Sequence, residues 1–216
     1  MSELIVEYSR PDSDRAGTHL VVLLHGYGSN EQDLMGLVPA LPQEDFTYAS
    51  LRAPEQVPGG MGFQWFGLSG GPGEFGMDPG EAQAAAEQVI HWIETQREGY
   101  AGVSLLGFSQ GMSVATSVVR SRPELASAVV GLSGFVVDQQ SEFFDDAALL
   151  ARVPKLPFFY GRDQEDPVIG AERAAFSLDW LREHTDLTKV VYAGIGHSVC
   201  NQEIGHVGEF LRHVLV

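Results

Sequence analysis

A serine between two glycines is the residue with the clearest chemical meaning in this sequence. Residues 107–111 read GFSQG and match the pattern G-x-S-x-G, in which the serine sits on a sharp turn between a strand and a helix. The glycines leave room for the strained turn and for the helix that follows it closely. The pattern predicts that Ser109 is a nucleophile. The alternative is a tight strand–helix turn without a catalytic role.

The same pattern occurs a second time, in the GLSGG of residues 67–71. Ser109 follows the apolar run at residues 103–106 and precedes a helical pattern, as a strand–turn–helix element requires. Ser69 lies in a glycine-rich stretch with Pro72 just after it and no strand pattern before it. We therefore expect Ser109, and not Ser69, to be the nucleophile.

The general base is predicted to be a histidine late in the chain. A serine hydroxyl is a weak nucleophile at neutral pH and needs a base within hydrogen-bond distance. Around serine turns of this kind the chain order is serine, then acid, then histidine. His197 lies in the glycine-rich segment GIGHS after an apolar run at residues 190–192. His206 and His213 fall in the last helical pattern, where we interpret them as surface or packing residues. His184 ends the preceding helical pattern, where a cation interacts favourably with the helix dipole.

Three carboxylates follow the apolar run at residues 158–160, and one of them should orient the imidazole. We favour Asp166, because the turn that it forms with Pro167 should fix its carboxylate at the end of the loop. Asp163 is the competing candidate, and Glu165 is the third.

Two backbone N–H groups should stabilise the oxyanion that forms when the serine attacks. One is expected from Gln110, the residue after the nucleophile. The other is expected from the early glycine-rich segment LHGYGS at residues 24–29, where Tyr27 is the predicted donor. His25 precedes the serine in the chain, and we interpret it as a structural loop residue.

These residues need a framework of strands and helices, and the sequence alternates the two. Short apolar runs occupy residues 20–24, 48–51, 103–106, 128–132, 158–160 and 190–192. Helical patterns occupy residues 33–41, 81–96, 110–120, 171–184 and 203–215. This alternation predicts an α/β fold with a mostly parallel central sheet, buried by helices on both faces. The length of 216 residues suits a single domain.

Residues 53–80 interrupt the alternation with a segment dense in glycine and proline. The segment is too long for an ordinary connection. Its aromatic side chains and Met61 favour a packed loop that lines a cleft.

Composition excludes several classes of function. The chain has 13 Lys+Arg and 29 Asp+Glu, a net charge of −16, which argues against nucleic acid and anionic lipid as partners.

The sequence contains no phosphate-binding glycine motif and no spacing of metal ligands, so no cofactor and no metal are expected. No apolar stretch approaches 18 residues, so we expect no stable membrane insertion. The single cysteine and the charged N-terminal segment without a signal-peptide pattern predict a cytoplasmic protein.

Five segments together resemble the phospholipase/carboxylesterase family, small esterases of the α/β-hydrolase fold related to acyl-protein thioesterases. They read LLHGYGSNEQDL, RAPEQVPGGMGFQWF, LLGFSQGM, DPVIG and GIGHSV, and the likeness runs from about Leu20 to the C-terminus. The resemblance implies a triad of Ser109, Asp166 and His197, with the amides of Tyr27 and Gln110 as oxyanion hole. It also implies that homodimers are common.

The expected activity is hydrolysis of small-molecule carboxylic esters through an acyl-enzyme. The alternatives are a thioesterase or lysophospholipase on the same fold, or a non-catalytic protein that binds a small ligand. The acyl group is expected to meet four side chains of the glycine-rich loop, namely Met61, Phe63, Trp65 and Phe66.

Two features depart from the family pattern. Trp-[Phe/Tyr]-Asp is usual in the family, whereas this chain has Trp65-Phe66-Gly67. Gly161 precedes Asp166 by five positions, where the family has a shorter spacing, and this keeps Asp163 as an alternative acid.

Overall fold

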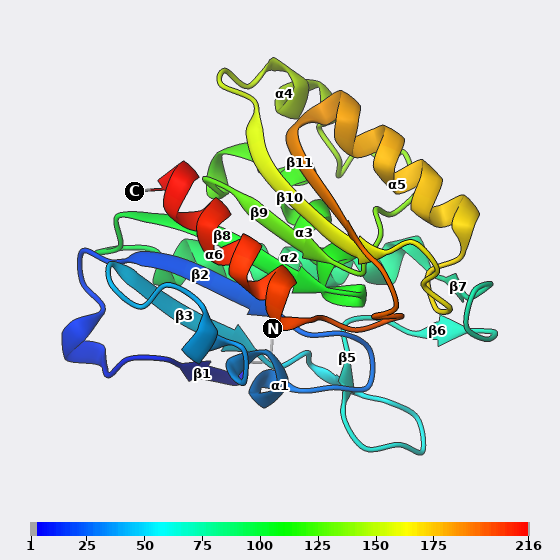
Figure 1. The fold of residues 1–216 in the computed structure, drawn as a ribbon, viewed down its shortest axis with the longest axis horizontal. Helices are drawn as coiled ribbons and strands as arrows, with labels where there is room; N and C mark the ends of the chain where they lie inside the picture. Colours follow the sequence, from blue (N-terminus) through cyan, green and yellow to red (C-terminus); the bar gives the residue numbers. More distant parts are fainter. Residues whose placement is uncertain (1–3, 216) are drawn as a thin grey trace.

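A seven-stranded twisted sheet forms the centre of the molecule (Figure 1). The structure, a computed structural model, describes residues 4–215, so residues 1–3 of the charged N-terminal segment lie outside it. In spatial order the strands are β1 (Val6–Tyr8), β3 (Phe46–Leu51), β2 (His19–Leu24), β8 (Gly102–Phe108), β9 (Val129–Leu132), β10 (Leu156–Asp163) and β11 (Thr185–Tyr192). Strand β1 pairs antiparallel with β3, and the other neighbours are parallel.

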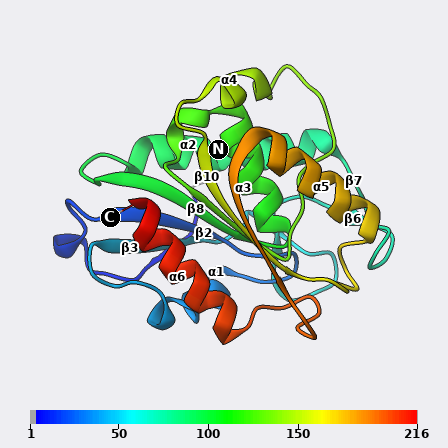
Figure 2. The same cartoon turned by 45° about the horizontal axis from the view of Figure 1, so that its top comes forward.

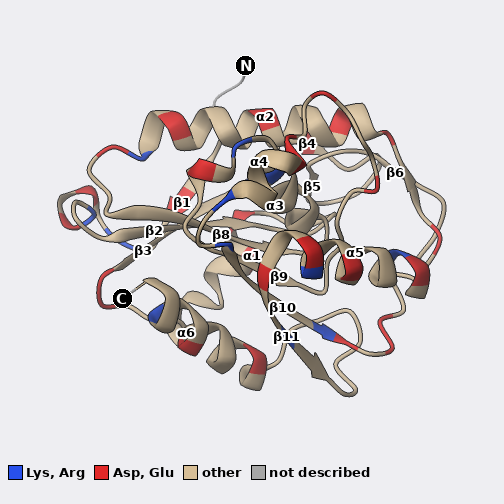
Figure 3. Ribbon diagram, turned by 90° about the horizontal axis from the view of Figure 1, so that it is seen from above, with Lys and Arg blue, Asp and Glu red and all other residues tan. Residues whose placement is uncertain are grey.

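Helices cover both faces of this sheet. They are α1 (Glu31–Met35), α2 (Pro79–Gln96), α3 (Gln110–Ser121), α4 (Asp146–Ala151), α5 (Ala171–His184) and α6 (Asn201–Leu215). Side chains of α2, α3, α4 and α5 pack in one apolar cluster on one face, and those of α1 and α6 pack in a second cluster on the other. Figures 2 and 3 show α6 on the opposite side of the sheet from α2 and α3. The predicted α/β-hydrolase architecture is confirmed.

The double cover explains why a strand in the middle of the sheet, such as β2, is an almost continuous apolar run. Along β2, Leu20 and Val22 belong to the first cluster. Val21 and Leu23, which point the other way, belong to the second. Since both faces are buried, the strand is an unbroken apolar run rather than an alternating one.

One predicted helix is wrong in its extent. The pattern at residues 33–41 forms only the short α1, followed by a 3₁₀ turn at Val38–Ala40. Pro39 lies inside that pattern and has no N–H to donate to a continuing helix, so the α-helix ends before it.

The glycine-rich segment 53–80 folds into two small hairpins. The first pairs β4 (Glu55–Gln56) with β5 (Phe63–Gln64), and the second pairs β6 (Leu68–Ser69) with β7 (Gly76–Met77). Both lie at the edge where the parallel strands end (Figure 1). The segments after β2, β8, β10 and β11 therefore meet the hairpins at one edge of the sheet, which is where ligands bind in open α/β sheets.

No helix within residues 4–215 has the length and apolar character needed to cross a membrane.

Candidate active site

Ser109 lies on a strained turn between β8 and α3, with φ of 54° and ψ of −118°. A non-glycine residue rarely adopts a positive φ, and such strain clusters at functional sites. A Cβ on Gly111 would collide with the carbonyl oxygen of Leu24, and one on Gly107 would collide with the backbone of Gly111. The two glycines of the sequence pattern are thus required by the close approach of α3 to β2 and β8.

The structure brings Ser109, His197 and Asp166 into one line of hydrogen bonds. Ser109 Oγ lies 2.8 Å from His197 Nε2. His197 Nδ1 lies 2.9 Å from Asp166 Oδ2 and 3.1 Å from Oδ1. When Nδ1 carries the proton and donates it to the carboxylate, Nε2 is free to accept the serine proton.

The surroundings of Asp166 keep it ionised. Burial acts to raise the pKa of this carboxyl, since its side chain is completely shielded from solvent. The hydrogen bonds from His197 and from the backbone N–H groups of Ile169 and Val168 outweigh burial and lower its pKa below the ordinary value. A fixed negative charge therefore lies on one side of the His197 imidazole. The imidazole side chain itself is 17% exposed to solvent.

Asp163, the competing acid, faces a different partner. Its Oδ2 accepts a hydrogen bond of 2.6 Å from the Gly196 N–H, and its Oδ1 accepts one of 3.0 Å from the Glu165 N–H. These backbone N–H groups, that of Glu165 first, lower the pKa of Asp163. The carboxylate therefore ties the loop after β10 to the loop that carries His197. The third candidate, Glu165, is exposed.

The early loop after β2 packs directly against the serine turn. A Cβ on Gly26 would lie 3.3 Å from Ser109 Cβ and 3.1 Å from the ring of Phe108, so only a glycine fits comfortably there. Within residues 4–215, neither the Tyr27 N–H nor the Gln110 N–H donates a hydrogen bond. Two unused N–H groups beside a nucleophile are what an oxyanion hole needs.

The side chain of Gln110 has a second task, which the sequence analysis missed. It is 1% exposed; its Oε1 accepts a hydrogen bond from the Trp65 N–H at 2.9 Å, and its Nε2 donates to the Phe66 carbonyl at 2.8 Å. The indole of Trp65 donates to the His25 carbonyl at 2.9 Å. A polar residue at the first position of a buried helix is the signal that could have revealed this link.

His25 holds the early loop in place, as its structural interpretation predicts. The ring is fully buried, and its Nδ1 lies 2.8 Å from the Gly26 carbonyl. Its Nε2 accepts a hydrogen bond of 3.0 Å from the Ala53 N–H. Burial lowers the pKa of His25, so the ring is neutral at neutral pH.

The four side chains expected to meet an acyl group do not share one wall. Met61 is 92% exposed at the tip of the β4–β5 hairpin, whereas Trp65 and Phe66 are 2% and 0% exposed in the core. Phe63 is half-buried beneath the Arg52 guanidinium. Which of the four contacts an acyl group stays a prediction.

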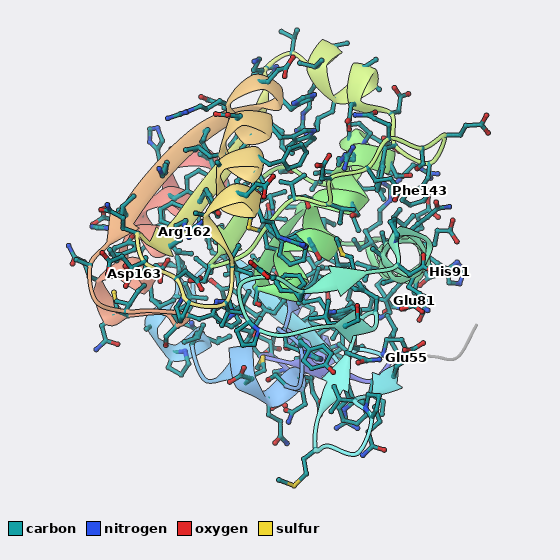
Figure 4. All side chains as sticks on the ribbon, turned by 90° about the vertical axis from the view of Figure 1, so that its right-hand side faces the viewer. Glu55, Glu81, His91, Phe143, Arg162 and Asp163 are labelled. Atoms are coloured by element: carbon teal, nitrogen blue, oxygen red, sulfur yellow. The ribbon has the colours of Figure 1, made fainter. Side chains whose placement is uncertain are left out.

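A carboxylate from α2 lies beside Gly67, where the family usually has aspartate. Glu81, labelled in Figure 4, accepts a hydrogen bond of 2.8 Å from the Gly67 N–H. A Cβ at position 67 would lie 3.2 Å from the same Glu81 oxygen. Gly67 therefore lies next to the carboxylate of Glu81, although position 67 has no acidic side chain of its own.

The other candidates lie away from this line. Ser69 is exposed on β6 and makes no hydrogen bond to a histidine within the described part of the chain. His206 Nδ1 lies 2.9 Å from the Tyr192 hydroxyl. Among residues 4–215 no group of three or more His, Cys, Asp or Glu side chains could hold a metal ion.

A strained serine turn at the carboxyl edge of a mostly parallel sheet, facing a histidine and an acid from later loops, defines an α/β hydrolase. The sequence pattern of the Phospholipase/Carboxylesterase family matches residues 11–215, and the chain belongs to this family. It is an esterase/thioesterase-type α/β hydrolase.

Individual relatives agree with this membership. Esterase YpfH of Escherichia coli K12 is 25% identical over 214 residues, which cover 94% of this chain and 85% of that protein. The fold is shared with Zea mays acyl-protein thioesterase 2, at 20% identity and a TM-score of 0.77, over 98% of this chain and 99% of that one. It is also shared with the Bacillus cereus carboxylesterase, at 14% identity and a TM-score of 0.79, over 98% and 95% of the two chains.

Proposed function

We propose that the protein hydrolyses small-molecule carboxylic esters through an acyl-enzyme formed on Ser109. The observation that carries the proposal is the unbroken line of hydrogen bonds from Asp166 through His197 to the serine hydroxyl, 2.9 Å and 2.8 Å long. Both distances lie within the range at which a base can take a proton from a nucleophile.

The first half of the reaction forms the acyl-enzyme. Ser109 Oγ attacks the ester carbonyl carbon while its proton passes to His197 Nε2. Asp166 stabilises the resulting imidazolium from the opposite side of the ring. When the tetrahedral intermediate collapses, the carbon–oxygen bond to the alcohol breaks and the imidazolium gives its proton to the departing oxygen.

The second half releases the acid. A water molecule attacks the acyl-serine while His197 again takes the proton. Collapse of the second intermediate returns the proton to Ser109 Oγ and frees the carboxylic acid. In both halves the N–H groups of Tyr27 and Gln110 stabilise the oxyanion, an effect of roughly 3 kcal/mol for each donor.

The rival activities share most of this mechanism. A thioesterase or a lysophospholipase would use the same three side chains on a different leaving group or acyl chain. The family membership and the esterase relative favour an ester substrate. A panel of esters and thioesters with matched acyl chains separates the activities by their kcat/KM values.

Replacing the nucleophile tests the proposal directly. We expect Ser109→Ala to lower turnover of a short p-nitrophenyl ester by at least about 10³-fold, because the acyl-enzyme cannot form. Ser69→Ala is the matched control, since it removes the serine of the second G-x-S-x-G pattern, and it should leave turnover nearly unchanged. Retention of most activity in Ser109→Ala would refute the assignment.

A further inference from the structure

Among the residues that the structure describes, two arginines are buried, and only one of them has a carboxylate partner there. Arg120 is 1% exposed and makes two hydrogen bonds of 2.8 Å to Asp146. Arg162 is 7% exposed and donates to the Asp163 carbonyl at 2.8 Å and, at 3.4 Å, to the Tyr160 hydroxyl. Within residues 4–215 no carboxylate oxygen lies within 4.0 Å of its guanidinium. A buried cation without a counter-ion is costly, so the site favours an anion.

A cavity of about 380 Å³ opens beside Arg162, under α5 and at the edge formed by β10 and β11. Figure 4 shows Arg162 and Asp163 at this edge of the sheet, next to α5. The helix contributes small side chains to the wall, those of Ala171, Ala174 and Ala175. The volume falls in the range of small-molecule sites.

A second cation lines the same cavity. Strands β10 and β11 are in a register that pairs Tyr160 with Lys189 and Arg162 with Val191. Lys189 therefore lies two positions from the partner of Arg162 and on the same face of the sheet, as a diagonal neighbour. The Lys189 ammonium also has no carboxylate within 4.0 Å among the described residues. Two unpaired cations thus line one cavity of a chain with net charge −16.

The one carboxylate in the cavity wall is already engaged. Asp163 accepts hydrogen bonds from the N–H groups of Gly196 and Glu165.

We propose that this cavity, the Arg162 cavity, binds a small organic carboxylate. The guanidinium of Arg162 matches the two oxygens of a carboxylate in a forked geometry, and the Lys189 ammonium adds a second charge. The carbon chain of the ligand lies against the alanines of α5, whose small side chains leave the space. The proposal does not depend on the proposed ester hydrolysis, since none of these residues belongs to the serine site.

Thermal unfolding of the full chain tests this site, with sodium butyrate as the probe and its neutral analogue butanamide as the control at constant ionic strength. We expect butyrate to raise the unfolding midpoint by roughly 3–5 °C at about ten times its Kd, because only the folded state binds it. Butanamide should have no effect. A chain that responds alike to both compounds would overturn the proposal.

Two variants locate the effect. Lys189→Gln should lose most of the butyrate shift, whereas Lys155→Gln, which removes the same charge from the other lysine, should keep it. Arg162→Gln should lose the butyrate-induced shift of the unfolding midpoint entirely. If this substitution of a buried residue prevents folding, Lys189→Gln provides the test. Equal shifts in the two lysine variants would place the ligand elsewhere, and a larger shift with inorganic phosphate than with butyrate would overturn the carboxylate assignment.

Discussion

Asp163 and Asp166 are three positions apart, yet their carboxylates face different partners. Asp166 accepts a hydrogen bond from the imidazole of His197. Asp163 accepts one from the backbone N–H of Gly196, the residue before His197. The sequence favours Asp166 because of its proline but leaves Asp163 open, since no linear pattern says which oxygen turns toward the histidine. The folded loop gives the two carboxylates different partners. Asp166 contacts the imidazole ring of His197, and Asp163 contacts the backbone of the loop that carries this ring.

Asparagine variants of the two residues should therefore differ sharply. Asp166→Asn is expected to lower kcat by about 10⁴-fold, because an amide no longer selects the tautomer in which Nε2 accepts the serine proton. Asp163→Asn should have a much smaller effect on kcat, since the imidazole keeps its carboxylate. Steady-state kinetics on one ester measures both. Equal losses, or a larger loss in Asp163→Asn, would contradict the proposed roles.

Glu203 on α6 is an acid that the proposed mechanism does not use. It is completely buried, and neither carboxyl oxygen has a hydrogen-bond partner within the described residues. A Cβ on Gly161 would collide with its Oε1, so the glycine of β10 makes room for the carboxyl. Burial raises the pKa of Glu203 to about 7, which leaves a large part of it protonated at neutral pH.

This acid should make stability depend on pH. In the unfolded chain its pKa is near 4.5, so between pH 4.5 and 7 the unfolded state binds fewer protons than the folded state. The contribution of Glu203 to the free energy of unfolding therefore falls as the pH rises through this window. Glu203→Gln cannot ionise, and its stability relative to the wild type should increase by roughly 3 kcal/mol from pH 4.5 to pH 8. Urea unfolding at both pH values measures the change, and a difference that stays constant with pH would contradict it.

At the scale of elements, the parallel strands inside the sheet could be predicted because each contains an apolar run that is buried on both faces. The edge strand β11 was predicted only at residues 190–192, because most of its other residues are polar and only partly buried or exposed. Strand β1 escaped the prediction because it has three residues, none of them fully buried, at the antiparallel edge. Helix α4 escaped because it spans six residues, of which only Leu149 is buried. The hairpins of segment 53–80 pair over two residues each, too few for a periodic pattern to reveal.

The buried guanidinium of Arg120 joins helices α3 and α4 to the segment that lies between them. From α3 it reaches Asp146 at the start of α4 and the carbonyls of Val137 and Gln139 in the segment between them. Arg120→Ala would leave the Asp146 carboxylate and two carbonyls without this partner. We expect the free energy of unfolding to fall by about 3–5 kcal/mol.

Arg122→Ala is the matched control for this prediction, from the C-terminal end of the same helix. The Arg122 side chain is 44% exposed and pairs with Glu94 and Glu124 at the surface. Its loss should cost less than about 1 kcal/mol in urea unfolding. Comparable losses in the two variants would show that the Arg120 contacts do not hold these elements together.

At the scale of the whole molecule, the fold class could be predicted from the alternation of strands and helices, and the family from the resemblance of five segments to known members. The members of the site could be named from the sequence but their geometry could not, because its serine and histidine are 88 positions apart in sequence and meet only across the folded sheet edge. The unpaired Arg162 was not predicted, since burial of a charge and absence of its partner are properties of the fold. A homodimer and a cytoplasmic location stay predictions from the sequence.

Acidic residues dominate the charged surface. Figure 3 shows Asp and Glu along α2, where Glu81, Glu87 and Glu94 are exposed. This distribution agrees with the net charge of −16 and suits an uncharged or cationic partner better than a polyanion.

Labelling with a fluorophosphonate tests the central claim, that the folded chain activates one serine. The reagent bonds covalently to a serine hydroxyl only where a base and an oxyanion hole make it nucleophilic. We predict one adduct for each native chain, located on Ser109 by mass spectrometry of the peptides, and none on the urea-unfolded chain. A native protein that stays unlabelled, or one that carries the adduct on Ser69, would contradict the account.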